Sequence, residues 1–289
     1  TTMSHTLPDL TGTFVDEGYL RLVELLGIGG SAKVYKAIDT TSPSDDPVFF
    51  AVKCMSDGAP GSRQRKLLTN EFNTHTAVAE HPGVLSLHRV FIDRNLVFMV
   101  FDLCSGDMLD CVVERQLYVG RPSLVKQAFL ELLDAVEHCH KMGVYHRDMK
   151  PQNVLCNVTG TGIRLADFGA ATRLEESRAF GCGTQPYMSP ECFDLTRGSY
   201  SPRESDTWAL AVTLVVLATR HVPWASAQVS DPSYAAFRAD PEHFLRRLLS
   251  LTDEANDILR RCFHVDPASR PSIAQLRAAI LSTECFLVA

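Results

Sequence analysis

The pattern of apolar and polar positions changes about one third of the way along the 289-residue chain. Before residue 102, short apolar runs rich in Val, Phe and Leu alternate with polar breaks, which is typical of β-strands. We expect strands near residues 20–26, 33–37, 48–53, 85–92 and 96–101. A single helix is expected in this part, over residues 65–78. Residues 1–17 are polar and irregular, which indicates a surface segment leading into the first strand.

After about residue 106 the pattern becomes helical. Apolar side chains recur at helical spacing over residues 123–142, which predicts a helix with Ser123 as its N-cap and Gly143 as its stop. The apolar run 208–218 is too short to span a bilayer and predicts a buried helix, which Ser205 or Asp206 could cap. Further helices are expected near residues 243–250, 252–263 and 272–281. A strand-rich part followed by a helical part predicts an α+β protein of two lobes, and a cleft between lobes favours a small-molecule site.

Composition narrows the class of protein without naming an activity. The hydrophobic fraction is 45% and the charged fraction 21%, as in a packed globular chain. The net charge of −6 argues against a protein dedicated to nucleic acid. None of the nine cysteines forms a C-x-x-C pair, and no secretory signal is visible in the first twenty residues. We therefore expect reduced thiols in a cytoplasmic or nuclear protein, with no membrane or nucleic-acid partner.

Two features of the strand-rich part carry candidate chemistry. Residues 27–31 read Gly-Ile-Gly-Gly-Ser between two predicted strands, so backbone N–H groups there could approach phosphate oxygens, although many hairpins contain glycines for turn geometry alone. Ala32 stands where a third glycine would complete the usual pattern. Lys53 ends the third strand, and Glu71 lies eighteen positions later on the predicted helix, where it could hold the lysine against nucleotide phosphates. Both charged residues could equally be ordinary solvated side chains.

The segment 145–155 is the most informative one. Asp148, Lys150 and Asn153 lie within six positions on a loop that Pro151 keeps from becoming helical. Such a loop can offer a carboxylate to a hydroxyl proton, an ammonium to a phosphate and an amide oxygen to a metal. Asp167 follows in the sequence Ala-Asp-Phe-Gly. Because Mg²⁺ prefers one or two carboxylates plus substrate phosphates, Asp167 and Asn153 form a reasonable half-site.

Taken in order, these segments resemble the protein kinase family: a Gly-rich loop, a strand lysine, H-R-D-x-K-P-x-N and D-F-G. Later segments extend the resemblance: a substrate-docking loop at 183–187, Ser-Pro-Glu at 189–191 in place of A-P-E, an anchoring helix at 206–211, and D-P-x-x-R-P at 266–271. Arg270 is expected to pair with Glu191. The resemblance implies the two-lobed kinase fold, whose parts are a lead-in at 1–18, a small β-rich N-lobe with one main helix at 19–102, a hinge at 103–106 and a larger helical C-lobe at 107–289.

The resemblance also implies ATP and Mg²⁺ as ligands and a role for each matching residue. Lys53, held by Glu71, would contact the α- and β-phosphates. Asp148 would orient the substrate hydroxyl and accept its proton, while Lys150 would steady the γ-phosphoryl group. Asn153 and Asp167 would bind Mg²⁺. The other nucleotide contacts would come from Gly27, Ile28, Gly29, Gly30, Val34, Ala51, Phe101 as gatekeeper, Asp102, Leu103, Cys104, Asp107 and Leu155. Three of these residues, Val34, Ala51 and Leu155, could equally belong to the hydrophobic core.

Lys150 and Thr184 resemble the serine/threonine class, so the sequence predicts a signalling enzyme that phosphorylates Ser and Thr of protein substrates, with a monomeric catalytic domain. The sequence around His75 and the short segments 101–107 and 180–192 are most similar to a fungal branch associated with nutrient sensing and repression of meiosis. Two alternatives stay open: a pseudokinase-like scaffold that binds ATP without efficient transfer, and a kinase of small molecules on a related fold.

The resemblance further bears on regulation. Phe180 stands three residues before Gly183, where kinases of this family often carry a regulatory phosphosite. Arg147, beside the catalytic Asp148, is the residue that often receives such a phosphate. We therefore expect the nineteen-residue stretch 170–188 to be ordered by packing, and activity not to require its phosphorylation.

Overall fold

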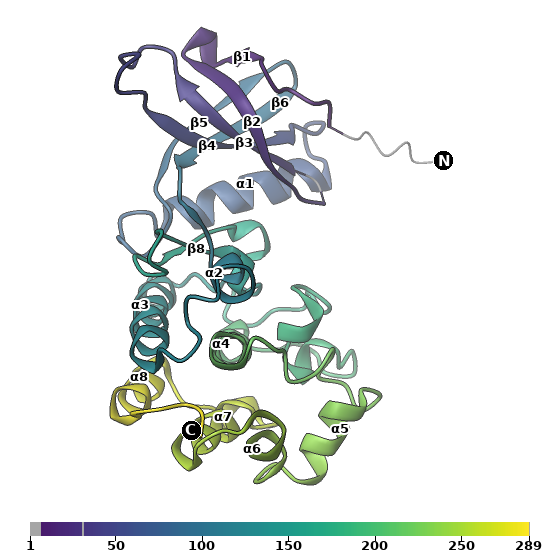
Figure 1. Ribbon diagram of the computed structural model, residues 1–289. Helices are drawn as coiled ribbons and strands as arrows, with labels where there is room; N and C mark the ends of the chain where they lie inside the picture. Colours follow the sequence, from purple (N-terminus) through teal and green to yellow (C-terminus); the bar gives the residue numbers. More distant parts are fainter. Residues whose placement is uncertain (1–6, 31, 289) are drawn as a thin grey trace. The chain divides into compact units, whose positions relative to one another are not determined.

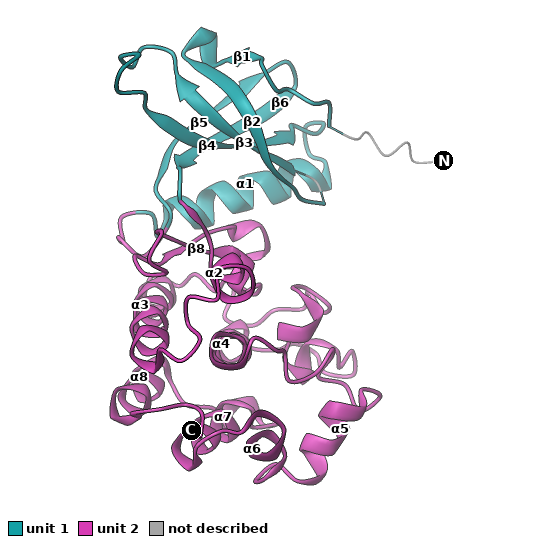
Figure 2. Cartoon of the chain, viewed as in Figure 1, with its two compact units in different colours: residues 1–79, 85–104 teal, residues 80–84, 105–289 magenta. Residues whose placement is uncertain are grey.

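The computed structural model of the chain describes residues 7–30 and 32–288. Residues 1–6 of the predicted lead-in, Ser31 of the predicted glycine turn and Ala289 at the end of the predicted C-lobe lie outside the described part. The chain divides into two compact units, residues 1–79 with 85–104 and residues 80–84 with 105–289 (Figure 2). The first unit holds a large sheet and one long helix, and the second is mainly helical (Figure 1). The α+β architecture predicted from the sequence is confirmed.

The first unit is built on an antiparallel sheet with the strand order β1-β2-β3-β4-β6-β5. Its strands are β1 (Phe14–Val15), β2 (Leu20–Ile28), β3 (Ala32–Asp39), β4 (Phe49–Ser56), β5 (Leu87–Asp93) and β6 (Leu96–Asp102). The five predicted strands are present with slightly shifted bounds. The expectation of an irregular segment up to residue 17 was wrong at β1, because Val15 is buried and pairs with Leu20.

Alternation along the strands gives this sheet two different faces. One face carries the core of the unit, formed by Val15, Leu20, Leu22, Tyr35, Ala37, Val52, Cys54, Phe98 and Val100. Helix α1 (Arg63–Thr76) lies against the sheet (Figure 1). It begins where the Ser62 side chain accepts a hydrogen bond from the Arg65 N–H at 3.2 Å, two residues earlier than the sequence pattern predicted.

The second unit contains seven described α-helices and a small sheet. The helices are α2 (Met108–Val113), α3 (Pro122–Lys141), α4 (Pro202–Thr219), α5 (Pro232–Ala239), α6 (Phe244–Leu249), α7 (Asp253–Cys262) and α8 (Ile273–Ser282). The sheet has the order β7-β8-β9, with β7 (Gly106–Asp107), β8 (Val154–Cys156) and β9 (Arg164–Leu165). Helices α2 and α5 were not predicted. Residues 80–84 group with this unit because the Leu165 N–H donates to the Gly83 carbonyl at 2.8 Å.

Two predicted helix starts were wrong for the same reason. Helix α3 begins at Pro122, with Arg121 at the N-cap position, so Ser123 lies inside the helix. Helix α4 begins at Pro202, so Ser205 and Asp206 lie inside it instead of capping it. Proline suits the first turn of a helix, where its missing N–H costs no hydrogen bond. The longer α4 places Asp206 in the interior, with no exposed surface.

The core of the second unit surrounds helix α4. Trp208 on this helix is fully buried and packs edge-on against Phe263, with ring centroids 4.9 Å apart. Trp224 lies at the same distance from Phe263, and Tyr234 and Phe237 complete the aromatic group. Within the described ranges, the chain has no helix whose length and apolar character would suffice to cross a membrane.

The two faces of β2 allow a direct test of the first unit's core. Leu22→Ala removes a fully buried side chain, and we expect it to lower the free energy of unfolding by about 2–5 kcal/mol. The register shift between Leu22 and Glu24 brings Leu25 rather than Leu26 against the core. The control Leu26→Ala therefore changes a half-exposed side chain that points away from the core, and it should cost less than about 1 kcal/mol. Urea denaturation of both variants would measure the difference, and equal losses would contradict the assignment of the two faces.

Candidate active site

The lysine and glutamate singled out by their spacing form a close ion pair in the first unit. The Nζ atom of Lys53 on β4 lies 2.6 Å from Oε1 of Glu71 on α1. Glu71 is buried, and 15% of the Lys53 side chain is exposed. A partly exposed ammonium held by a buried carboxylate has a fixed position and can still reach an anion.

Pairing across the sheet places several predicted nucleotide contacts on the same face as Lys53. Val34 pairs with Lys53, and Ala51 pairs with Phe101. Residues paired across antiparallel strands project on the same side, and so do residues two apart on one strand. Val34, Ala51, Lys53 and Phe101 therefore share the face opposite the core. Val34 and Ala51 are half-buried, whereas the core residues Val52 and Cys54, which alternate with Lys53 on β4, are buried.

The glycines of the β2–β3 turn are not required by the chain's own packing. None of Gly27, Gly29 and Gly30 has a positive φ. A Cβ atom would meet nothing within 4 Å at Gly27 or Gly30, and at Gly29 it would lie 3.7 Å from the Ala32 carbonyl. The fold itself therefore does not require glycine at these positions. A backbone without side chains does, however, allow a phosphate to approach closely. Ile28 between them is 71% exposed, so it too is free of the core.

The segment after β6 is held from two sides. The backbone N–H of Asp102 donates to the Ser86 carbonyl at 3.3 Å, and its carboxylate lies 2.6 Å from Nε2 of His88. Leu103 and Cys104 follow and are half-buried. The ring of Phe101 packs against that of buried His75, with centroids 5.3 Å apart. No contact was predicted for the side chains of His75 and His88, since a lone histidine in a polar stretch does not indicate its partners.

In the second unit, one buried carboxylate organises the loop that carries the candidate catalytic residues. Asp206 on α4 accepts hydrogen bonds from the backbone N–H groups of His146 and Arg147, each at 2.8 Å, and lies 2.9 Å from Nε2 of His140. Burial alone would raise the pKa of Asp206, but the hydrogen bonds and nearby His140 and His146 hold it below its ordinary value. The carboxylate is thus kept ionised, and it positions the residues just before Asp148.

Asp148 lies next to the two partners that the sequence placed with it. Its Oδ2 is 2.9 Å from Nζ of Lys150 and 3.1 Å from Nδ2 of Asn153. Its Oδ1 is buried and has no hydrogen-bond partner in the described part of the chain. A buried, unpaired carboxylate oxygen is costly unless something else binds it. Oδ1 is therefore the atom that would accept a proton or a hydroxyl hydrogen bond from a substrate.

The two predicted metal ligands lie on neighbouring segments. Asn153 directly precedes β8 and Asp167 follows β9, and the Ala166 N–H donates to the Asn153 carbonyl at 2.9 Å. The Asn153 amide nitrogen is used by Asp148, so its oxygen is the atom that a cation would bind. In the described ranges no three His, Cys, Asp or Glu side chains form a metal cluster. Mg²⁺ held largely by substrate phosphates needs none, so this donor set fits it.

Asp107 and Leu155 occupy paired positions on β7 and β8. The Asp107 carboxylate accepts a hydrogen bond from the Asp110 N–H at 2.9 Å and so caps α2, a role the sequence pattern did not indicate. Burial raises the pKa of Asp107. Leu155 is half-buried.

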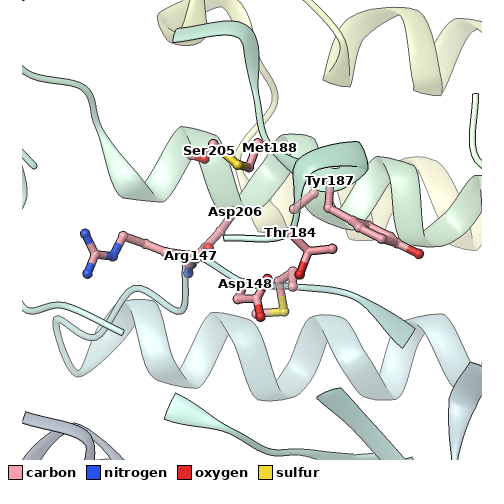
Figure 3. Close-up of a pocket in the computed structure, with 9 residues that line it drawn as sticks. Arg147, Asp148, Thr184, Tyr187, Met188, Ser205 and Asp206 are labelled. Carbon is pink, nitrogen blue, oxygen red and sulfur yellow. Dashed lines mark hydrogen bonds between the residues drawn. The ribbon is translucent and has the colours of Figure 1, made fainter. Parts of the chain in front are cut away.

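A small pocket joins the candidate catalytic loop to the candidate docking loop (Figure 3). Its lining residues are Arg147, Asp148, Met149, Thr184, Tyr187, Met188, Ser205, Asp206 and Ala209. Thr184 Oγ1 accepts a hydrogen bond from Lys150 Nζ at 2.7 Å, which ties the two loops together. Burial, together with the Asp148 carboxylate, raises the pKa of Tyr187 to about 12. In Figure 3 the Arg147 side chain points away from Asp148 and Thr184.

Residues 183–191, from the docking loop to Glu191, form the docking segment, and the predicted ion pair fixes its far end. The Arg270 guanidinium donates to both carboxylate oxygens of Glu191, at 2.5 and 2.8 Å, and also to the backbone carbonyls of Glu204 and His264. Both side chains are buried. The guanidinium also lies 5.0 Å from the Trp208 ring centroid, so the pair connects the docking segment to the aromatic core.

A helical unit with an H-R-D loop and a sheet with a lysine–glutamate pair together define the protein kinases. The chain belongs to this family: the family model described as the protein kinase domain matches residues 20–280. The chain is 33% identical over 283 residues to the "Negative regulator of sexual conjugation and meiosis" of Schizosaccharomyces pombe, covering 90% of this chain and 59% of that protein. It is 30% identical over 249 residues to the "Serine/threonine-protein kinase ksp1" of the same yeast, covering 83% and 52%.

Relatives outside the fungi also match. The chain is 30% identical over 269 residues to the "CBL-interacting serine/threonine-protein kinase 17" of Arabidopsis thaliana, covering 90% of this chain and 59% of that protein. The chain thus spans between half and three fifths of the length of these relatives. The fission yeast matches confirm the resemblance to a fungal branch of serine/threonine kinases.

The buried carboxylate of Asp206 can be tested by Asp206→Asn. The amide keeps one acceptor but turns an NH₂ group towards one of the two backbone N–H donors, so we expect a stability loss of about 1–3 kcal/mol. The matched control Asp45→Asn, at an exposed loop position, should change stability by less than about 0.5 kcal/mol. Thermal denaturation at pH 7 measures both.

The same carboxylate has a pH signature. Because its folded-state pKa lies below the ordinary value of 3.8, its stabilising contribution is present above about pH 4 and is lost as the pH falls through the folded value. The stability gap between wild type and Asp206→Asn should therefore narrow on acidification. A gap that stays constant down to pH 3 would contradict this role.

Proposed function

We propose that this protein is an active serine/threonine protein kinase that transfers the γ-phosphoryl group of ATP to Ser and Thr hydroxyls of proteins with the help of Mg²⁺. The observation that carries the proposal is the buried, unpaired Oδ1 of Asp148, which lies on a carboxylate flanked by Lys150 and Asn153. Family membership supports phosphate transfer from ATP as the class of reaction.

The chain's own residues divide the chemical work. Asp148 accepts the hydrogen of the substrate hydroxyl and directs its oxygen towards the phosphoryl group. The ammonium of Lys150, 2.9 Å from Asp148, offsets negative charge that develops near the transferred group. Lys53, held by Glu71, and the bare backbone of Gly27, Gly29 and Gly30 bind phosphates.

Asn153 and Asp167 are the residues that would hold Mg²⁺. When bound, the ion neutralises charge on the phosphate oxygens. The remaining nucleotide contacts proposed from the family resemblance are those of Ile28, Val34, Ala51, Phe101, Asp102, Leu103, Cys104, Asp107 and Leu155. Val34, Ala51 and Phe101 lie on one face of the first unit's sheet, and Leu103 and Cys104 follow β6. Asp107 and Leu155 are paired on β7 and β8. These positions support the assignment.

Several observations favour protein Ser and Thr as acceptors. Lys150 bonds to Thr184 of the docking loop, and two of the relatives above carry names of serine/threonine kinases. A pseudokinase scaffold is not favoured, because Lys53, Asp148 and Asp167 are all present. The docking loop and its Glu191–Arg270 anchor argue against a small-molecule kinase.

We further propose an N-lobe at 19–102, a hinge at 103–106, a C-lobe at 107–289, a monomeric catalytic domain and a cytoplasmic or nuclear location. All nine cysteines are free thiols, which supports a reducing compartment. A role in restraining conjugation and meiosis, as the name of the first yeast relative states for that protein, is a candidate for the whole protein.

Phosphate transfer to a Ser/Thr peptide library, with ATP and Mg²⁺, tests the proposed function. Asp148→Asn removes the proton acceptor while keeping the shape of the side chain, and we expect kcat to fall about 10²–10⁴-fold. Asp45→Asn, at an exposed loop position, should leave kcat unchanged. Wild-type transfer no faster than that of Asp148→Asn would refute the kinase reading and leave the scaffold in its place.

The contact between Lys150 and Thr184 gives a second test. Thr184→Val keeps the shape of the side chain but leaves the Lys150 ammonium without this acceptor, so we expect kcat/KM for a Ser/Thr peptide to fall about tenfold or more. Thr184→Ser restores an acceptor and should recover most of the rate. Steady-state kinetics would decide, and a Val variant as active as wild type would show that the contact has no catalytic role.

A further inference from the structure

A single buried serine interrupts an exposed part of the chain between Gly169 and the docking loop. Its neighbours Arg173, Leu174, Glu175, Glu176 and Arg178 are exposed, whereas Ser177 is only 2% exposed. The Ser177 N–H donates to the Tyr200 carbonyl at 2.8 Å, and the Tyr200 N–H donates back to the Ser177 carbonyl at 2.9 Å. This two-residue antiparallel bridge joins the loop to the segment that precedes α4.

The Ser177 hydroxyl lies on the arginine that precedes the catalytic aspartate. Its Oγ accepts hydrogen bonds from NH1 of Arg147 at 3.0 Å and from the Ala179 N–H at 3.1 Å. Nε of Arg147 donates to the Ala170 carbonyl at 2.7 Å. Arg147 therefore binds two uncharged groups of the loop, the Ala170 carbonyl at its start and the Ser177 hydroxyl in its middle.

Tyr200 fixes the other side of the bridge. It is 3% exposed and belongs to a cluster with Met188 and Cys192, against which Phe180 and Phe193 pack. Its hydroxyl donates to the Ala179 carbonyl at 3.2 Å. Burial raises the pKa of Tyr200, and nearby Ser177 and Arg147 partly offset the rise. Met188 lies in the docking segment, so the cluster connects the bridge to the surface that would receive the peptide.

We propose that Ser177 and Tyr200 are positioning residues that clamp Arg147 and the docking segment in the working arrangement without any phosphate on the loop. The proposal rests on the proposed kinase function. The Arg147 guanidinium already has two acceptors in the clamp, the Ser177 hydroxyl and the Ala170 carbonyl, and Ser177 is too buried to be modified unless the bridge opens. A phosphate on its Oγ would also displace the Ala179 hydrogen bond and place a dianion beside a single guanidinium.

The central experiment compares untreated protein with protein that a broad-specificity phosphatase has made phosphate-free, as verified by intact mass. We expect kcat/KM for a Ser/Thr peptide to agree within about twofold, since no contact of the clamp needs a phosphate. A loss of tenfold or more that MgATP preincubation restores would overturn the proposal. Ser177→Glu activity above that of wild type would do the same.

Ser177→Ala separates positioning from general stability. Loss of the hydroxyl loosens the docking segment, so we expect the peptide KM to rise about fivefold while the ATP KM and Tm change little. The matched control Ser199→Ala, next to Tyr200, should leave both KM values unchanged. A lower Tm and kcat with both KM values unchanged would indicate a merely structural role and overturn the assignment.

A measurement that does not depend on activity distinguishes failure of the clamp from failure of the proposed function. In phosphate-free wild-type protein, the amides of Ser177 and Tyr200 should be protected from hydrogen exchange, and Ser177→Ala should lose this protection. Fast exchange at both amides in wild type would refute the clamp whether or not the protein transfers phosphate. Protected amides in a protein with no Asp148-dependent transfer would refute the kinase function alone.

Discussion

The candidate catalytic centre depends on one buried carboxylate. Asp206 sits inside helix α4, and two consecutive backbone N–H groups and a histidine donate to it. Burying a carboxylate is costly unless hydrogen bonds compensate it, and these three contacts do so. Because the second N–H belongs to Arg147, the position of Asp148 follows directly from this contact. A rigid helix in the core thereby positions a loop that has little regular structure of its own.

The docking segment is held by the same helix at several points. The buried Glu191–Arg270 pair fixes its end against α4 and Trp208. A cluster of buried hydroxyl and thiol groups adds a second attachment. Ser189 Oγ lies 3.0 Å from Ser205 Oγ and 3.2 Å from Cys192 Sγ. Removing one partner of a buried ion pair leaves an uncompensated charge, which typically costs about 3–5 kcal/mol of stability. The geometry of the docking segment is therefore coupled to the stability of the second unit.

In the first unit, the two-residue alternation along the strands positions the candidate site residues. Residues on one face make the core, and the other face carries Lys53, Val34 and Ala51 at positions set by strand register. A one-residue slip would bury the lysine and expose the core, so the register is strongly specified. Glu71 then needs only to lie on the helix against that face to hold the lysine.

Local patterns in the sequence determined the strands, the longer helices and the chemistry-bearing residues, since strand alternation, helical periodicity and motif spacing are properties of neighbouring positions. Spacing suggested the Lys53–Glu71 contact and the family resemblance supported it, whereas the Glu191–Arg270 contact followed from the family resemblance. Tertiary structure decided what depends on distant residues. It extended α4 back to Pro202, buried Asp206, and gave Ser177 a partner twenty-three positions away in Tyr200. A hydroxyl in a polar loop looks ordinary until the chain folds, because its hydrogen-bond partners are not its neighbours in sequence.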